Sequence, residues 1–182
     1  METKKWTIDP AHTNIHFKAK HLMITTVTGN FGEFTGSVES LGDDFSQGKF
    51  EFTAKVDSIS TGNAERDGHL KSEDFFNAET YPELHFQSKE VKSVDGDNFE
   101  LIGDMTIRDV TKSVSLNIEV GGIAKDPWGN LKAGFSFSGK MNRKDFGLKF
   151  HVVNEAGNLL VSDQIKLEGE VQLAAVEVPV EA

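Results

Sequence analysis

Apolar and polar residues alternate one by one along several long segments of this sequence. Residues 49–57 carry apolar side chains at every even position and polar ones at every odd position, and residues 113–120 repeat the pattern. Residues 131–141 alternate as well, with apolar residues or glycine at the odd positions. Because successive side chains of a β-strand point to opposite faces, these segments fit strands with one buried face. The pattern predicts an antiparallel, all-β protein.

About eight such strands follow one another, joined mostly by short turns, of which Asp95-Gly96 is the clearest hairpin signal. A β-sandwich and a closed barrel both satisfy the alternation. The length of the strands favours an antiparallel barrel of about eight strands, because closure removes long exposed edges. The predicted strands cover residues 6–9, 14–20, 31–40, 49–57, 84–94, 99–107, 113–123, 131–141 and 164–173.

We expect one domain over residues 1–182, since no linker, repeat or low-complexity tract divides the chain. Residues 174–182 are expected as a weakly ordered tail or a frayed strand end. Two short helical insertions are also predicted. One is a short helix or irregular turn over Ala64–Phe76, which Asn63 can cap, and the other is a single helical turn within residues 21–28.

The segment Thr61–Ser88 interrupts two predicted strands. It combines charged residues at one end with the aromatic pair Phe75-Phe76 further along. Such an insertion suits the mouth of a cavity. The alternative is a structural plug, with Arg66 and Asp67 as a surface pair and the phenylalanines in the core. The local sequence leaves both interpretations open.

The interior of an eight-stranded barrel is either filled by side chains or left hollow for one ligand. Glycines lie on the apolar faces at Gly103, Gly139 and Gly169, with Gly32 and Gly36 on an earlier strand. They either leave volume for a ligand or ease bulges and bends in the sheet. The large apolar residues between them favour an elongated apolar cavity. The candidate wall residues are Phe17, Phe34, Phe50, Phe52, Phe86, Leu101, Phe135, Phe137 and Leu167.

The composition narrows the classes of partner. A net charge of −10 and a pI near 5.0 argue against nucleic acid or an anionic membrane as a bulk partner. The absence of cysteine excludes disulfides and thiol nucleophiles. No apolar run reaches transmembrane length, and no signal-peptide core precedes the first strand. We expect a cytoplasmic protein as written, or a periplasmic one if an export signal has been removed.

The sequence predicts no catalytic residues, no metal site and no resident cofactor. His12, His16 and His21 are the best candidates for metal ligands, but their spacing is loose. Nothing supplies a convincing further ligand or a catalytic glutamate. The GxSxG elbow, the phosphate-binding glycine loop and the dinucleotide fingerprint are all missing from the sequence.

Two clusters of basic residues stand out on this acidic chain. One contains Arg66 and the other Arg143. A guanidinium at a barrel mouth can bind a phosphate or carbonyl head group through charge-assisted hydrogen bonds. The alternative, which we favour, is that each arginine pins a loop to the barrel, with Asp67 and Asp145 as the respective partners.

Taken together, several motifs make the sequence resemble the YceI-like family. They are WTIDPAHTNIHF, HLMITTVTGNFGEFTG, STGNAERDGHLKSEDFFNAETYPELHFQS, LIGDMTIRDVTKSV and MNRKDFGL, and the resemblance runs from Trp6 to about Leu173. It implies a lipocalin-like barrel whose elongated cavity holds a polyisoprenoid, such as an isoprenoid quinone or polyprenyl pyrophosphate, or another long-chain lipid. One departure is Asp109, where the turn in this family is usually glycine.

The resemblance also implies roles for particular residues. Phe75 and Phe76 are expected as a lid on the cavity side, and His21, Arg66 and Arg143 as candidates near a polar head group. Members of the family look like binding or carrier proteins that often pair, which leaves a homodimer open.

The leading hypothesis is a non-catalytic carrier for a long apolar lipid, above all a polyisoprenoid. A metal-dependent enzyme acting on a lipid or small molecule is one alternative. A barrel with a filled core that serves as a stress-related interaction module is another.

Overall fold

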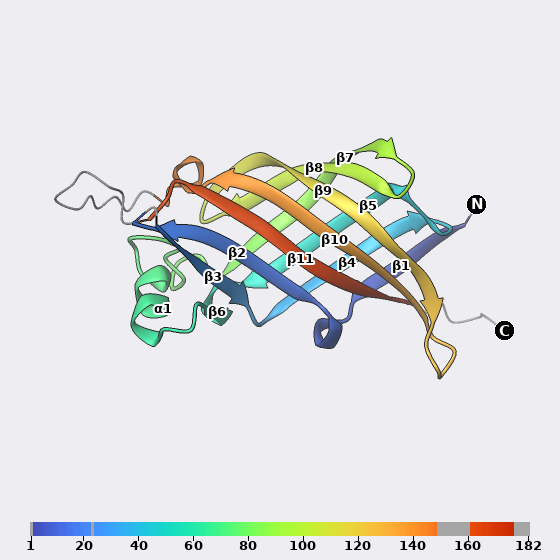
Figure 1. The fold of residues 1–182 in the computed structure, drawn as a ribbon, viewed down its shortest axis with the longest axis horizontal. Coiled ribbons are helices and arrows are strands. Elements are labelled where there is room, and N and C mark those ends of the chain that lie inside the picture. Colours follow the sequence, from blue (N-terminus) through green and yellow to red (C-terminus); the bar gives the residue numbers. More distant parts are fainter. Residues whose placement is uncertain (1, 23, 149–160, 177–182) are drawn as a thin grey trace.

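All strands of the protein belong to one antiparallel sheet that closes on itself. The computed structural model describes residues 2–22, 24–148 and 161–176. Figure 1 shows long strands running obliquely side by side around a common interior. The closed antiparallel barrel confirms the predicted fold class. The strands are β1 (Thr3–Ile8), β2 (Asn14–His21), β3 (Thr25–Phe31), β4 (Phe34–Leu41), β5 (Asp44–Lys55), β6 (Ile59–Ser60), β7 (Glu83–Asp95), β8 (Asn98–Ile107), β9 (Val110–Lys125), β10 (Leu131–Asn142) and β11 (Gln164–Ala175).

These segments form eight strands around the barrel, because three of the eight are interrupted and each of those three consists of two segments. β1 and β2 are two halves of the first, and β3 and β4 are two halves of the second. The pairings show this: β1 pairs with β4 while β2 pairs with β3. In the third, β5 continues through the 3-10 turn η2 (Val56–Ser58) into β6. The order around the barrel therefore follows the order along the chain.

The last strand closes the barrel against the first. One edge of β11 pairs with β10, and its other edge pairs with β1 and β2, for example at Ile8↔Leu173 and Phe17↔Leu167. Between β1 and β2 lies the 3-10 turn η1 (Pro10–His12). Because proline has no N–H to donate to a ladder, the interruption of the first strand follows from Pro10.

The helix α1 spans Ala64–Lys71 and lies at one end of the barrel (Figure 1). It begins at the predicted cap, where the side chain of Asn63 accepts a hydrogen bond from the N–H of Arg66 at 3.0 Å. It ends before the predicted Phe76, because Ser72 takes an extended conformation and caps the last turn through hydrogen bonds from its N–H and hydroxyl to the carbonyl of His69. No helix in the described ranges is long and apolar enough to cross a bilayer.

One local expectation is wrong. The described part of residues 21–28 is not helical, because β2 continues to His21 and β3 starts at Thr25. Of the two alternatives for residues 174–182, the end of a strand fits Ala174, because it pairs with Lys132 on β10 and extends the ladder of β11. The end of the predicted tail, residues 177–182, lies outside the described residues.

The end of the barrel away from α1 is filled by aromatic side chains. Trp6 on β1 is completely buried, and its ring lies 5.4 Å from that of Phe45 on β5. Phe50 continues this packing along β5, with its ring 6.1 Å from Phe99 on β8. Such ring pairs stabilise the packing by ~0.5–1.5 kcal/mol each beyond the area they bury. This end is therefore a packed core.

Candidate functional site

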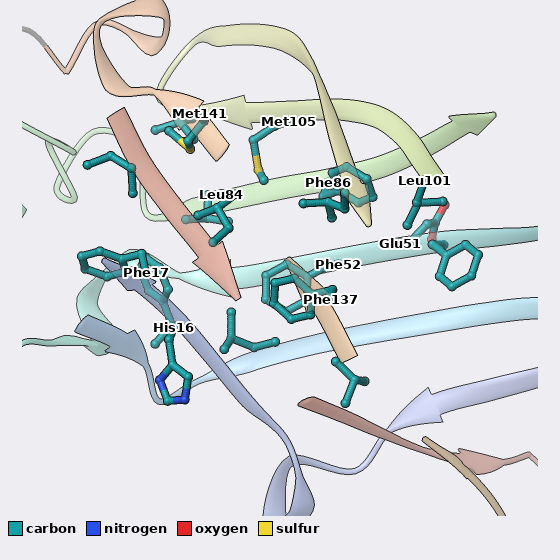
Figure 2. Close-up of a pocket in the computed structure, with 18 of the residues that line it drawn as sticks. His16, Phe17, Glu51, Phe52, Leu84, Phe86, Leu101, Met105, Phe137 and Met141 are labelled. Carbon is teal, nitrogen blue, oxygen red and sulfur yellow. The ribbon is translucent and has the colours of Figure 1, made fainter. Parts of the chain in front are cut away.

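The barrel encloses an elongated cavity of about 200 Å³. Figure 2 shows apolar side chains from several strands converging on it, including Phe86 on β7, Leu101 and Met105 on β8, and Phe137 on β10. They point inward because they occupy alternate positions on strands whose opposite face meets solvent. A cavity with such a lining suits an apolar ligand.

Most residues predicted for the binding site lie in the wall of this cavity. Those that line it are Phe17, Phe50, Phe52, Phe75, Phe76, Phe86, Leu101, Phe135, Phe137, Arg143 and Leu167. Phe34, His21 and Arg66 are not among the lining residues. Phe34 is half-buried and packs against Phe52, with ring centroids 5.9 Å apart, while His21 ends β2 in a bridge to Val161. Contact of each lining residue with a ligand stays a prediction.

Two glycines of the apolar faces provide room for neighbouring phenylalanines. A Cβ on Gly103 would lie 2.5 Å from the ring of Phe86, and one on Gly169 would lie 2.7 Å from the ring of Phe137. Both distances are shorter than the closest approach of two non-bonded carbon atoms. At these positions the expectation that glycine leaves open volume is wrong, because a large side chain already occupies the space.

The insertion between β6 and β7 covers the other end of the cavity. Leu70, Phe75 and Phe76 all line it, and Phe75 is only 5% exposed. The ring of Phe76 meets that of Phe31 edge-on at 6.2 Å. The aromatic pair therefore lies on the cavity side, and its movement as a lid stays a prediction.

Arg143 lies in the wall near the same end, and its guanidinium binds the backbone of the protein itself. The side chain is 2% exposed. Its Nε donates to the carbonyl of Ser162 at 3.0 Å, its Nη1 to that of Leu148 at 2.6 Å, and its Nη2 to that of Val161 at 3.2 Å. Arg143 thus joins the end of β10 to the start of the segment that leads into β11.

The acidic neighbour of Arg143 differs from the one expected. Asp163 lies 3.5 Å from Nη2, whereas Asp145 forms no described ion pair with it. Burial lowers the pKa of Arg143, and the charge of Asp163 opposes this effect. The guanidinium stays charged at neutral pH, because arginine starts from a pKa above ~12.

The chain has three arginines, and each of them donates to backbone carbonyls near the covered end of the barrel. Arg66 donates from Nη2 to the carbonyl of Thr61 at 2.8 Å, and Arg108 donates from Nη1 to that of Gly147 at 3.2 Å. These contacts, with those of Arg143, favour the structural interpretation of the basic clusters over a head-group site.

The sequence interpretation missed several lining residues. Ile8, Ile15, Met105 and Met141 lie on apolar faces of strands, so the alternation contains the signal for them. Leu148 lies in an irregular segment, where no periodicity indicates which side chains turn inward.

The polar members of the lining are His16, Ser37, Glu51 and Arg143. The first three occupy outward positions in the alternation of their strands. His16 and Ser37 lie next to the interruption between β1 and β2, and Glu51 pairs with Ser37 from β5. Within residues 2–22, 24–148 and 161–176, no group of three or more His, Cys, Asp or Glu is arranged to hold a metal ion. The arrangement as a whole can bury an apolar chain.

Comparisons with known proteins agree over nearly the whole chain. The sequence model described as the YceI-like domain matches residues 6–173. A UPF0312 protein of Photorhabdus laumondii is 41% identical over 160 residues, which cover 87% of this chain and 83% of that protein. The solved structure of a YCEI protein from Campylobacter jejuni is 34% identical with a TM-score of 0.75, covering 87% of this chain and 90% of that one.

A more distant structure shares the architecture. It is described as a polyisoprenoid binding domain from Saccharophagus degradans, and it is 13% identical with a TM-score of 0.68. The match covers 94% of this chain and 98% of that one. At this identity the likeness shows a common fold.

Proposed function

We propose, since the chain belongs to the YceI-like family, that it binds a long apolar lipid inside its barrel and carries the lipid without converting it. The observation that carries the proposal is the elongated, apolar cavity. A polyisoprenoid is the proposed class of ligand, and the description of the Saccharophagus degradans protein of the same fold supports that choice.

Binding in such a cavity is driven by the removal of apolar surface from water. Each buried methylene contributes ~0.8 kcal/mol, so about 20 buried carbons contribute ~16 kcal/mol before costs. Lost translational and rotational freedom and the ordering of side chains offset a large part of this. The remainder is enough for micromolar to nanomolar affinity.

The size of the cavity implies that the wall adapts to a ligand. Its volume of about 200 Å³ lies below the ~300–1,000 Å³ of ordinary small-molecule pockets. Met105 and Met141 line the cavity, and methionine changes its conformation more easily than branched or aromatic side chains. We expect these two residues to move first when a chain of about 20 carbons enters.

The proposal excludes a chemical step because the buried polar groups already have partners. In the described residues the buried polar side chains are Ser40, Arg143 and Ser162. Each makes hydrogen bonds within the protein. Ser40 and Ser162 are not among the residues that line the cavity, and Arg143 is a cation that cannot act as a general base.

Mass spectrometry of the recombinant protein, recorded natively and after organic extraction, tests the proposal. The protein is incubated with a polyprenyl alcohol of about 20 carbons and, in parallel, with a straight-chain alcohol of equal carbon number. A near-stoichiometric adduct with the polyprenyl compound supports a polyisoprenoid carrier. Equal loading with the straight chain supports the broader lipid class, and no adduct with either contradicts the proposal.

A further inference from the structure

The wall of the barrel contains a break at which two facing segments are not paired. The ladder between β1 and β4 ends at Thr7, and the ladder between β2 and β3 begins at His16. Residues 8–15 therefore face residues 31–36 without strand pairing. We call this break the seam.

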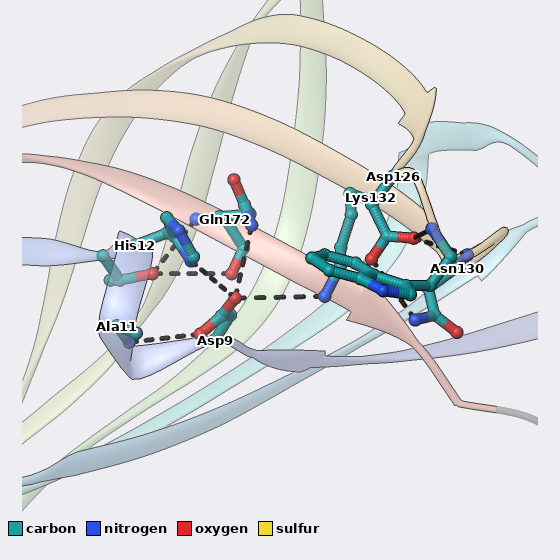
Figure 3. A network of polar contacts seen from close by, with 9 residues as sticks. Asp9, Ala11, His12, Asp126, Asn130, Lys132 and Gln172 are labelled. Carbon is teal, nitrogen blue, oxygen red and sulfur yellow. Dashed lines mark hydrogen bonds and ion pairs between the residues drawn. The ribbon is translucent and has the colours of Figure 1, made fainter.

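The turn on one side of the seam is bound to β11, away from the facing strand. The N–H of Asp9 donates to the carbonyl of Gln172 at 2.8 Å, and the N–H of Gln172 donates to Oγ1 of Thr13 at 3.0 Å. The carboxylate of Asp9 also binds Nδ1 of His12 at 2.9 Å, as Figure 3 shows. These bonds fix the η1 turn without using the strand across the seam.

The segment on the other side is bonded along its outer edge. The N–H of Gly32 donates to the carbonyl of Ser58 at 3.0 Å, and the N–H of Lys55 donates to that of Glu33 at 2.9 Å. Both bonds join this segment to the third strand of the barrel. Each side of the seam is therefore held in place by a neighbour other than its facing segment.

The cavity extends to the seam. Ile8 and Ile15 line it from one side. Of the lining residues described on strands, only His16, Ser37 and Glu51 occupy outward positions, and they lie beside or near the seam. At the seam the cavity therefore reaches the backbone of the wall. The outward side chains of His16, Ser37 and Glu51 form a polar rim on its outer side.

Apolar side chains fill the seam. Cγ1 of Ile8 lies 3.1 Å from the position that a Cβ of Gly36 would take. Phe34 is half-buried and contacts Phe52, which lines the cavity. These are van der Waals contacts, and side chains that make them can change rotamer on the nanosecond scale when partly exposed.

The seam costs less to open than a paired part of the wall. Separating two paired strands breaks several ladder hydrogen bonds, each worth ~0.5–1.5 kcal/mol net. One end of the barrel is closed by the packed core around Trp6, and the other by Phe75, Phe76 and the backbone contacts of Arg143. Opening the seam breaks no strand pairing.

We propose that the seam is the opening through which an apolar chain enters and leaves the cavity, and that Ile8 and Phe34 are the side chains that close it. The polar group of an amphiphilic ligand then stays at the outer rim, beside His16, Ser37 and Glu51. The inference rests on the proposed function, since it concerns uptake of the same ligand.

A disulfide across the seam tests this route. The chain has no cysteine, so Ile8→Cys/Gly36→Cys introduces the only thiols. The Cβ of Ile8 is one bond beyond Cγ1, which brings it close to the ~3.5–4.5 Å Cβ separation of a disulfide. Shortening Ile8 removes its contact with the new side chain, and the carbonyl of Glu51, 3.0 Å from that Cβ, has to shift by a few tenths of an ångström. The matched control is Thr106→Cys/Thr111→Cys on the paired strands β8 and β9, where the two Oγ1 atoms lie 2.8 Å apart.

The readout is stopped-flow uptake and release of a conjugated-polyene lipid whose fluorescence rises in an apolar site. We expect oxidation of the seam pair to slow both rates at least about tenfold, a change of ~1.4 kcal/mol in the barrier, and reduction to restore them. Oxidation of the control pair should leave the rates unchanged. Equal rates for a seam pair whose disulfide is confirmed by mass would overturn the inference.

A second variant keeps the test independent of disulfide formation. Phe34→Ala removes the larger of the two closing side chains and should raise the uptake rate several-fold at unchanged stoichiometry. An unchanged rate would contradict the role of Phe34. If the unmodified protein takes up neither the polyene nor a polyprenyl lipid, the proposed function fails. If it takes up lipid but the seam variants leave the rates unchanged, only the proposed route fails.

Discussion

The indole N–H of Trp6 donates a hydrogen bond of 2.8 Å to Oγ of Ser40 inside the packed end of the barrel. The two residues are 0% and 2% exposed. The hydroxyl of Ser40 donates in turn to the carbonyl of Gly42 at 2.7 Å. One buried hydroxyl therefore serves a donor on β1 and an acceptor in the turn between β4 and β5.

Replacing Ser40 by alanine should destabilise the protein by about 1–3 kcal/mol, because the indole N–H is left buried without a partner. Urea unfolding followed by far-UV circular dichroism measures the change. Ser37→Ala, at an exposed position on the same strand, is the control and should change stability by less than ~0.5 kcal/mol. Equal stability of the two variants would show that the bond contributes nothing.

Phe52→Asp should abolish lipid uptake while leaving the barrel folded. Phe52 lines the cavity and is half-buried, so aspartate places a charge where the apolar chain would lie. Native mass spectrometry measures the bound lipid. Thr53→Asp introduces the same side chain on the opposite face of β5 and should bind lipid normally. An unchanged stoichiometry in folded Phe52→Asp would refute the cavity as the binding site.

Arg143→Met should destabilise the fold by roughly 2–4 kcal/mol, because the carbonyls of Leu148, Val161 and Ser162 lose a buried charged donor. Chemical unfolding gives the value. Arg143→Lys should recover only part of it, since an ammonium lacks the planar fork that reaches several carbonyls. Lys144→Met, at a half-exposed neighbour, is the control. A lipid affinity that falls without any loss of stability would instead favour a head-group role for Arg143.

The stability of the protein should depend on Asp9 at acid pH. The hydrogen bond from His12 is the main cause that lowers the pKa of Asp9, and the N–H of Ala11 adds to it against the opposing effect of burial. A carboxyl group with a lowered folded-state pKa contributes stability above its unfolded value of ~3.9, and this contribution is lost as the pH falls through the folded value.

In Asp9→Asn, the free energy of unfolding should therefore fall less steeply than in the unmodified protein as the pH is lowered from about 5 to 2. Urea midpoints measured across this range give the slope. Asp43→Asn makes the same change of charge at a side chain that is 62% exposed, and it serves as the control. Parallel slopes for all three proteins would mean that Asp9 contributes no pH-dependent stability.

The alternation of the sequence predicts the barrel and most of its inner wall, because the period of two survives wherever a strand is continuous. Phe50, Phe52 and Phe137 line the cavity as expected. Phe34 shares the inward face of β4 with Val38, but it lies at the interruption of the second barrel strand and packs against Phe52 without lining the cavity. Its contact with Phe52 depends on how the two strands meet.

The partners of the arginines could not be read from the sequence. Arg143 binds carbonyls of Val161 and Ser162, which carry no side-chain signal and lie about 20 positions away. A search among neighbouring carboxylates leads to Asp145 instead of Asp163. The expectation that Gly103 leaves open volume was wrong for a related reason. Its neighbour Phe86 lies on a separate strand, and only the register of the folded sheet brings the two together.

The closed ring also constrains the order in which the protein can fold. Around the barrel, every pairing joins strands that are consecutive in the chain except the one that brings Ile8 to Leu173. Hairpins can form progressively as the chain emerges from the ribosome, but the first strand cannot be closed until β11 has been made. Until then two strand edges stay open to other chains, and the time spent in that state sets how readily the nascent protein aggregates.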